Sequence, residues 1–301
     1  MYRITHLFIR AFEKALHILH KWDERFGGRT FRAERHRKLV IRSAECHSMT
    51  GDADEAYYRD QYWFWMEKYF RENHVSPVGS FLDLGCGQGR FSSLIAEHYV
   101  RSGGKVVGVD ISPEAIRVAE AYKEEKNLSS TEYRVDDLVP FLKQSKDNSF
   151  DAVLFIEVAF FLPGWESVTK EILRVLKPGG LLCASFRSRY FSLLYSIACG
   201  KWSDVPVILE KKEGVLWNTD IHFVWGSNDE TKQFLEETGF DVLGVMGIGN
   251  CSGIEGDPLA PVARPSGLDE EETKLLMKSE LAVAESVPDA GRYMFYVAKK
   301  K

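Results

Sequence analysis

A glycine-rich turn after a short apolar run constrains the fold of this chain more than any other segment. Residues 81–90 read Phe-Leu-Asp-Leu-Gly-Cys-Gly-Gln-Gly-Arg, which predicts a buried strand ending in an acid, a tight turn and a helix to about His98. Gly85 and Gly87 allow positive φ, and their missing Cβ atoms let a ligand lie against the main chain. The unpaired N–H groups of the helix N-terminus suit an anionic or polar ligand. We therefore expect an α/β fold with a nucleotide-like ligand at this turn.

The spacing of the glycines narrows the choice of ligand. Gly85, Gly87 and Gly89 form G-x-G-x-G, whereas dinucleotide sites use G-x-G-x-x-G, and the sequence lacks the phosphate-loop pattern G-x-x-x-x-G-K-[ST]. The next apolar run ends at Asp110, 21 residues after Gly89. An acid near that position accepts hydrogen bonds from both ribose hydroxyls, so a nucleoside ligand is still expected.

Further strands and helices alternate along the chain. Ser112 and Pro113 predict the start of a helix that runs to about Lys126. Apolar runs at 131–135 and 149–157 predict the third and fourth strands, and the third is followed by Asp136 and Asp137. After a helix that begins near residue 166, the Lys-Pro-Gly-Gly sequence at 177–180 predicts a helix end and a tight turn into a strand at 181–186.

In this order and spacing, the chain resembles the class I S-adenosylmethionine-dependent methyltransferases, over about residues 76–250 and again at a final strand, 292–299. The motifs that match are D-x-G-x-G-x-G, V-x-G-V-D-I-S, the paired acids at 136–137, N-S-F-D-A-V-L and L-R-V-L-K-P-G-G. The resemblance implies a Rossmann-like, mostly parallel seven-stranded sheet of order 3-2-1-4-5-7-6 with helices on both faces. It also implies a parallel sixth strand at 240–248 and an antiparallel seventh strand.

The resemblance further implies S-adenosylmethionine as the cofactor and S-adenosylhomocysteine as the product. The glycine loop with Cys86 would carry the methionine part, and Asp83 would hold the loop or the amino group. Asp110 would bind the ribose, and Ile111 would pack on the adenine. Asp136 would accept a hydrogen bond from the adenine amine, whereas Asp137 is the weaker candidate of the pair, and both could instead be solvated turn residues. Cys86 needs only to be small, and we expect no nucleophilic role for it.

The 301 residues suggest one domain with additions: an N-terminal helical extension or cap at 1–75 and a methyltransferase domain at 76–301. Two insertions, at about 187–226 and 249–291, leave the carboxyl ends of predicted strands, which is where open parallel sheets bind ligands. We expect both insertions and the N-terminal helices to converge over the methyl donor. Asp269 is expected to cap a helix at about 270–285.

The N-terminal segment and the composition bear on partners and localisation. Residues 3–22 place apolar side chains on one helical stripe opposite a basic face, which favours packing on the domain or a partner subunit and leaves a membrane surface or a transit peptide open. Residues 1–42 carry a net charge of +7 (11 basic, 4 acidic) and the remainder −12 (28 basic, 40 acidic). The acidic body argues against duplex nucleic acid. The five cysteines show no metal-ligand spacing, so we expect reduced thiols, no metal site and a cytoplasmic protein. The sequence leaves the oligomeric state open.

Residues 56–70 are dense in aromatic side chains and predict a helix. Tyr58 and Tyr62 lie four residues apart, so they share a helical face. The resemblance makes them candidates for covering the cofactor, and the alternative is that they fill the core.

Methyl transfer from an activated donor requires mainly positioning and exclusion of water, and a general base only for acceptors with a proton of high pKa. The candidates are Glu157, after the fourth strand, and Tyr190, Tyr195 and His222 in the first insertion, with capping or packing as the alternative for His222. The chain lacks the N/D-P-P-Y motif of amino-methyltransferases. It also lacks the second Glu and the His of metal-assisted quinone O-methyltransferases, having Ala-Phe-Phe at 159–161. A small-molecule acceptor, with an apolar or aromatic surface at Phe160 and Phe161, is the leading hypothesis. The alternatives are a protein, lipid or RNA substrate, and a non-catalytic cofactor-binding subunit.

Overall fold

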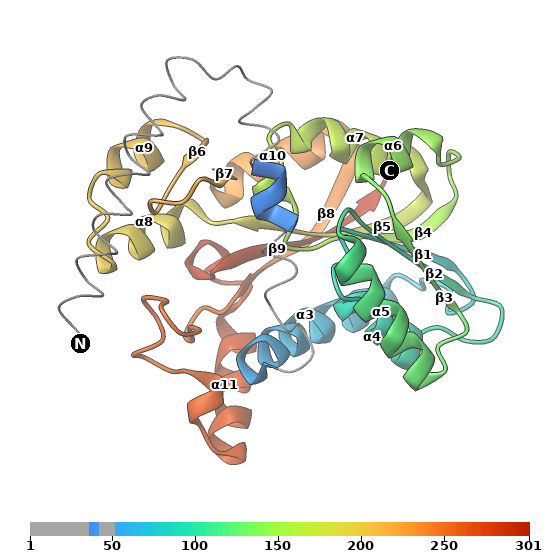
Figure 1. Ribbon diagram of the computed structural model, residues 1–301, viewed down its shortest axis with the longest axis horizontal. Helices are drawn as coiled ribbons and strands as arrows, with labels where there is room; N and C mark the ends of the chain where they lie inside the picture. Colours follow the sequence, from blue (N-terminus) through green and yellow to red (C-terminus); the bar gives the residue numbers. More distant parts are fainter. Residues whose placement is uncertain (1–35, 42–51) are drawn as a thin grey trace.

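Seven strands form one mixed sheet at the centre of the computed structural model, which describes residues 36–41 and 52–301 (Figure 1). The predicted helix at 3–22 and Cys46 lie outside the described residues. The strands of the sheet are β1 (Ser80–Leu84), β2 (Lys105–Asp110), β3 (Thr131–Val135), β4 (Phe150–Phe155), β5 (Leu176–Arg187), β8 (Phe240–Ile248) and β9 (Tyr293–Lys300). The larger helices are α3 (Ala53–Glu72), α4 (Arg90–His98), α5 (Pro113–Lys126), α6 (Leu138–Gln144), α7 (Trp165–Val175), α8 (Arg189–Ala198), α9 (Asp204–Glu210), α10 (Asn228–Thr238) and α11 (Glu270–Val283).

The strand order is β3-β2-β1-β4-β5-β9-β8, which confirms the predicted 3-2-1-4-5-7-6 topology, because β8 and β9 are the sixth and seventh strands of the sheet. The strands from β3 to β5 pair in parallel. β9 is antiparallel to both of its neighbours, and β8 meets the sheet only through β9. This arrangement brings the carboxyl ends of the parallel strands to one edge, where the glycine loop also lies.

Helix ends follow the local chemistry that predicted them. Ser112 accepts a hydrogen bond from the N–H of Ala115 at 3.1 Å, and Pro113 opens α5. Ser227 and Glu230 form a capping box at the start of α10, and Asp269 begins α11 in the same way. A side chain that accepts from an unpaired N–H group of the first turn typically contributes about 1 kcal/mol.

The segment at 177–180 differs from its prediction. α7 ends at Val175 and β5 begins at once with Leu176, which pairs with Phe150, instead of starting at Leu181 after a turn. The Lys-Pro-Gly-Gly residues bulge out of the strand, so that Ala152 pairs with Leu181. The reason is non-local, because pairing with β4 keeps the strand continuous across a sequence that would otherwise form a turn.

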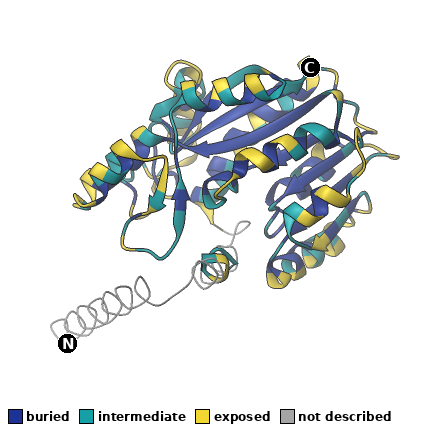
Figure 2. Ribbon diagram, turned by 90° about the horizontal axis from the view of Figure 1, so that it is seen from above, coloured by how far each residue is buried: buried dark blue, intermediate teal, exposed yellow. Residues whose placement is uncertain are grey.

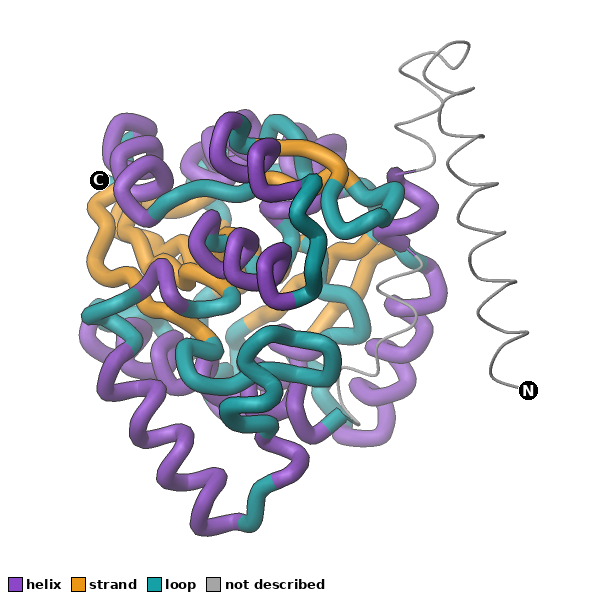
Figure 3. Tube along the Cα trace, turned by 90° about the vertical axis from the view of Figure 1, so that its left-hand side faces the viewer, coloured by secondary structure: helices purple, strands orange, loops and turns teal. Residues whose placement is uncertain are grey.

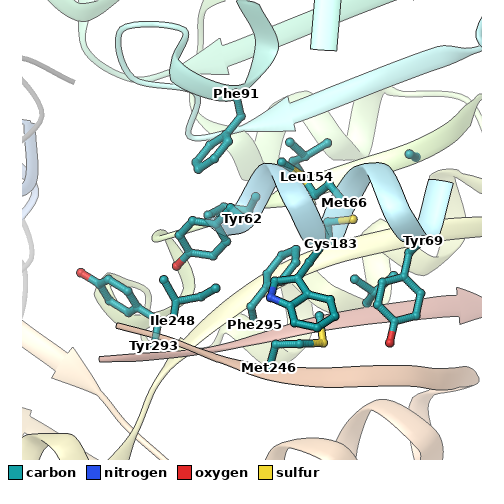
Figure 4. Packing of buried hydrophobic residues seen from close by; sticks show 14 of the residues in the cluster. Tyr62, Met66, Tyr69, Phe91, Leu154, Cys183, Met246, Ile248, Tyr293 and Phe295 are labelled. Carbon is teal, nitrogen blue, oxygen red and sulfur yellow. The ribbon is translucent and has the colours of Figure 1, made fainter. Parts of the chain in front are cut away.

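Each face of the sheet buries its own hydrophobic core. α3 and α4 cover one face, and α6, α7 and α10 cover the other. Figure 2 shows the central strands mostly buried between helices whose outer surfaces are exposed. α3 belongs to the first core, where Tyr62, Met66 and Phe295 pack together (Figure 4). α3, which the sequence analysis assigned to an N-terminal extension, therefore shares its core with the sheet. The boundary between an extension at 1–75 and a domain at 76–301 stays a prediction.

The two insertions lie beyond the carboxyl ends of the strands. The first holds α8, α9 and a hairpin of β6 (Glu213–Val215) and β7 (His222–Val224). The second holds a long loop, α11 and the 3₁₀ turns η2 (Pro265–Gly267) and η3 (Pro288–Ala290). Loops and short helices cover this end of the molecule (Figure 3). No helix within 36–41 and 52–301 is both long and apolar enough to cross a membrane.

Candidate active site

The glycine loop turns on three residues in the left-handed region, with φ of 71° at Gly85, 52° at Gly87 and 82° at Gly89. A Cβ on Gly85 would lie 2.4 Å from Val158, so close packing excludes a side chain there. A Cβ on Gly87, by contrast, would meet no atom within 4 Å. Gly87 therefore leaves an open space beside the main chain, which is the cradle that the sequence predicted.

Asp110 holds the loop in this shape. One oxygen of its carboxylate accepts the N–H of Gly87 and the other accepts the N–H of Ser112, both at 2.8 Å. Burial raises the pKa of Asp110, although these hydrogen bonds oppose the shift. A carboxylate offers about four acceptor positions, so Asp110 keeps acceptor capacity for a hydroxyl of a ribose.

Asp83 lies beneath the loop and not at the ligand. Its carboxylate is only 2% exposed and accepts the N–H of Ser92 at 3.0 Å, inside the first turn of α4. Burial raises the pKa of Asp83 to about 7. Asp83 was predicted to hold either the loop or the amino group of the cofactor. The structure shows a contact of the first kind, between Asp83 and the first turn of α4.

The acids after β3 differ in their local contacts. Asp137 caps α6 by accepting the N–H of Val139 at 3.0 Å, whereas Asp136 accepts the N–H of Asp137 at 2.8 Å. The N–H of Asp136 in turn donates to the carbonyl of Asp110. Asp136 is thus fixed next to Asp110, the predicted ribose ligand. The two acids are close enough along the backbone to contact the same nucleoside.

A cavity of about 520 Å³ opens above the loop, within the roughly 300–1,000 Å³ typical of small-molecule sites. Its walls come from residues 36–41, the start of α3, the strand ends and both insertions. The lining residues that the sequence analysis named are Gly85, Cys86, Gly87, Asp110, Ile111, Asp136, Asp137, Glu157, Phe160 and Phe161. The predicted convergence of distant segments over the loop is therefore confirmed.

The residues of this wall fit the predicted cofactor. The open side of Gly87 leaves room for a ligand against the backbone, and the carboxylates of Asp110 and Asp136 offer hydrogen-bond acceptors for a nucleoside. Burial raises the pKa of the Cys86 thiol well above its ordinary value, so the residue is a neutral, small part of the loop.

Glu157 stands where β4 ends, in a left-handed backbone conformation with φ of 59°. Its N–H donates to the hydroxyl of Ser185 at 2.7 Å, which helps to hold this strained backbone. Its carboxylate lies 3.4 Å from the buried guanidinium of Arg90, which also contacts Glu55 at 3.2 Å. The acid therefore lines the cavity in a fixed position.

Several predicted residues do not line the cavity. Tyr58 and Tyr62 point into the core, 3% and 0% exposed, and Figure 4 shows Tyr62 between Phe91 and Phe295. The aromatic face of α3 thus fills the core, and the same helix reaches the cavity through Glu55. His222 lies on β7 with its ring toward Glu213 at 3.4 Å, outside the lining. Gly89 is likewise outside it, and a Cβ at this position would lie 2.4 Å from the hydroxyl of Tyr133.

Residues 36–41 form a short helix at the cavity wall, and His36 fixes it. Its Nδ1 accepts the N–H of His222 at 3.1 Å, and its Nε2 lies 2.8 Å from the carbonyl of Phe161, to which it donates. These two bonds require a neutral imidazole, and burial lowers the pKa of His36 accordingly. The sequence analysis did not single out this residue.

Sequence reasoning also missed the cationic side of the cavity. Arg90, Arg187 and Arg292 line it from α4, the end of β5 and the residue before β9. The only available signal was that Arg187 and Arg292 flank the two insertions. In the residues that the structure describes, no group of three or more His, Cys, Asp or Glu side chains is arranged to hold a metal ion.

Comparison with known proteins identifies the family. A family model described as a methyltransferase domain matches residues 77–241. Ubiquinone biosynthesis O-methyltransferases from Albidiferax ferrireducens and Xanthomonas oryzae pv. oryzae are 32% and 35% identical to this chain over 119 and 108 residues. These matches cover 39% and 36% of this chain and 45% and 43% of the relatives, so the chain spans less than half the length of the curated relatives that it matches.

Solved structures agree at the level of the fold. A SAM-dependent methyltransferase from Methanosarcina mazei aligns with a TM-score of 0.53 and 20% identity, covering 77% of this chain and 96% of that one. An S-adenosylmethionine-dependent methyltransferase from Mesorhizobium loti aligns with a TM-score of 0.50 and 15% identity, covering 84% and 100%. The family match spans more than half of the sequence and includes the glycine loop, Asp110 and Asp136. The chain therefore belongs to the methyltransferase domain family, the class I S-adenosylmethionine-dependent methyltransferases.

Proposed function

We propose that this protein transfers a methyl group from S-adenosylmethionine to a small-molecule acceptor bound in the same cavity. The observation that carries the proposal is the composition of the cavity wall. One side presents the glycine loop with Asp110 and Asp136, and the other presents Phe160, Phe223 and other side chains from the insertions. Two ligands of different chemistry can thus be held face to face.

The donor side suits a nucleoside with an amino-acid tail. Asp110 would accept hydrogen bonds from the ribose, and Asp136 from the adenine amine. Ile111 and Leu138 supply apolar surface for the base, and Gly87 leaves its backbone open to the tail. When bound, the cofactor would supply an electrophilic methyl group on a sulfonium, and the carboxylates of the cavity would favour binding of that cation.

The acceptor side excludes water and fixes orientation. Aromatic and aliphatic side chains dominate it, so a bound acceptor would be desolvated and aligned with the methyl group, which is the main requirement of an in-line displacement. Glu157 lines the cavity and is placed to take a proton from an acceptor that carries one. His222 lies outside the lining, so we assign no proton transfer to it.

The cofactor assignment is tested with Asp110→Ala in calorimetric titrations with S-adenosylmethionine and S-adenosylhomocysteine. We expect the wild-type protein to bind both and the variant to bind at least tenfold more weakly, because both the ribose acceptor and the support of the Gly87 N–H are lost. The milder Asp110→Asn variant should lie in between.

The matched control is Asp241→Ala, which removes an exposed acid from β8. It should bind like the wild type. Absence of binding to the wild type, or equal affinities for Asp110→Ala and the control, would contradict the assignment. Incubation of metabolite extracts with methyl-labelled cofactor then identifies the acceptor, and label found only on macromolecules would exclude a small-molecule substrate.

A further inference from the structure

Arg187 is a buried cation in the acceptor side of the cavity. It is the last residue of β5, only 7% exposed, and it lines the cavity. Four aromatic rings surround its guanidinium, with the Cζ atom 4.7 Å from the ring centre of Phe160, 5.1 Å from Trp217, and 5.4 Å from both Phe223 and Tyr293.

No acid of the described part of the chain forms an ion pair with this guanidinium. Within residues 36–41 and 52–301 its side chain makes no ion pair or hydrogen bond, and its Nε is buried without a partner. The nearby acids are engaged elsewhere, because Asp257 pairs with Arg292 at 2.6 Å and Glu157 with Arg90 at 3.4 Å. The other buried arginines of the cavity are therefore neutralised, and Arg187 is not.

An unpaired buried charge is costly unless something compensates for it. The aromatic rings compensate in part through cation–π attraction. They cannot replace the hydrogen bonds of the guanidinium, whose fork of donors matches a carboxylate in bidentate geometry. The fold thus retains a donor set whose natural partner is an anion entering the cavity.

We propose that the methyl acceptor is a monocarboxylic acid with an apolar or aromatic body, and that Arg187 binds its carboxylate. This inference rests on the proposed function of the cavity. Among the buried arginines of the cavity, one uncompensated positive charge matches one negative charge, whereas a phosphate dianion would bring a second charge into surroundings of aromatic rings and acids. Phe160 and Phe223, which also line the cavity, would contact the body of the acid.

The carboxylate is the anchor and not the atom that is methylated. Methylation of a carboxylate oxygen removes its negative charge, so an arginine bound to it would stabilise the ground state more than the transition state. A nucleophile elsewhere on the acceptor would keep the ion pair intact throughout the reaction, and the product would remain an acid.

The experiment measures binding of matched probes to the protein saturated with S-adenosylhomocysteine, by ligand-observed NMR titration. The probes are benzoate and 3-phenylpropanoate, their neutral amides, and inorganic phosphate. We expect the carboxylates to bind at least tenfold more tightly than the amides and than phosphate. Arg187→Met should abolish this preference, and Arg187→Lys, which keeps the charge and loses the fork, should reduce it. Arg117→Met, on the exposed surface of α5, is the control with the same change in charge.

Stability separates binding from a purely structural role. Because Arg187 has no partner to leave unpaired, Arg187→Met should unfold at the same or a higher temperature than the wild type without ligand. The affinity of Arg187→Met for S-adenosylhomocysteine should stay within twofold of the wild-type affinity. If the cofactor binds but the carboxylates show no preference, this inference fails while the proposed function stands. Equal binding of carboxylates and amides by the wild type, a preference for phosphate, or loss of folding in Arg187→Met would each overturn the proposal.

Discussion

Two acids beside the glycine loop illustrate how position decides the role of a residue. Asp110 is the last residue of β2 and Asp83 the penultimate residue of β1, and the sequence places both next to the loop. Asp110 lines the cavity, whereas Asp83 lies below the loop and contacts only its support. Asp110 is therefore the acid that can contact a ligand, whereas Asp83 contributes to the stability of the loop.

The raised pKa of Asp83 makes stability depend on pH. The unfolded chain loses this proton near the ordinary value of 3.8, and the folded protein holds it up to about 7. The contribution of Asp83 is therefore complete below pH 4, is lost as pH rises to about 7, and is constant above that; its full size is at most about 4 kcal/mol.

We expect Asp83→Asn, which cannot ionise, to lose less stability than the wild type between pH 4.5 and pH 8. Urea unfolding at several pH values measures the difference, with Asp241→Asn as the exposed control. Parallel stability curves for Asp83→Asn and the wild type would contradict the burial argument.

At the scale of elements, one buried carboxylate ties the second insertion to the sheet. Glu280 of α11 is 1% exposed and accepts hydrogen bonds from the side chains of Tyr57, Gln61 and Ser252 and from the N–H of Cys251. The tyrosine and the glutamine belong to α3. Glu280 therefore joins the insertion to α3, alongside Asp54, which accepts hydrogen bonds from Arg264 and from the N–H of Ser266.

Replacing Glu280 by Ala should lower the free energy of unfolding by about 3 kcal/mol, because several buried donors lose their acceptor at once. Glu271→Ala, on the exposed side of α11, should change it by less than about 1 kcal/mol. Urea denaturation of both variants provides the test, and a similar loss in the two would show that the buried network contributes little.

Prediction from sequence succeeded where the signal is local and failed where it is not. The strand, loop and cap at 80–113 follow from glycine, proline and serine at fixed spacings, and the structure has them at the expected residues. Helical spacing gave Tyr58 and Tyr62 a common face but not the direction of that face, which packing against Phe295 decides. A lone arginine such as Arg187 carries no motif, so its burial among rings became visible only in three dimensions.

At the scale of the whole molecule, the cavity joins segments more than 200 residues apart, from Glu55 to Arg292. A ligand there should stabilise the entire fold and not one part of it. At a concentration of S-adenosylhomocysteine near 100 times its Kd, the added stability is about 2.7 kcal/mol. We expect one unfolding transition that shifts upward by several degrees in calorimetry, and a clearly smaller shift for Asp110→Ala at the same ligand concentration. A second transition that ignores the ligand would show that part of the described chain unfolds independently.

The placement of β9 between β5 and β8 has a consequence for the order in which the protein can assemble. β9 is the last strand in the chain, yet it occupies an inner position, and β8 pairs with no other strand of the sheet. A chain emerging from the ribosome can form the parallel half early, but β8 has no partner in the sheet until residues 293–300 follow. Arg292 and Tyr293 reach the cavity wall at the same step. The cofactor side of the cavity can thus form early in synthesis, whereas the acceptor side is completed only once residues 292–300 have followed.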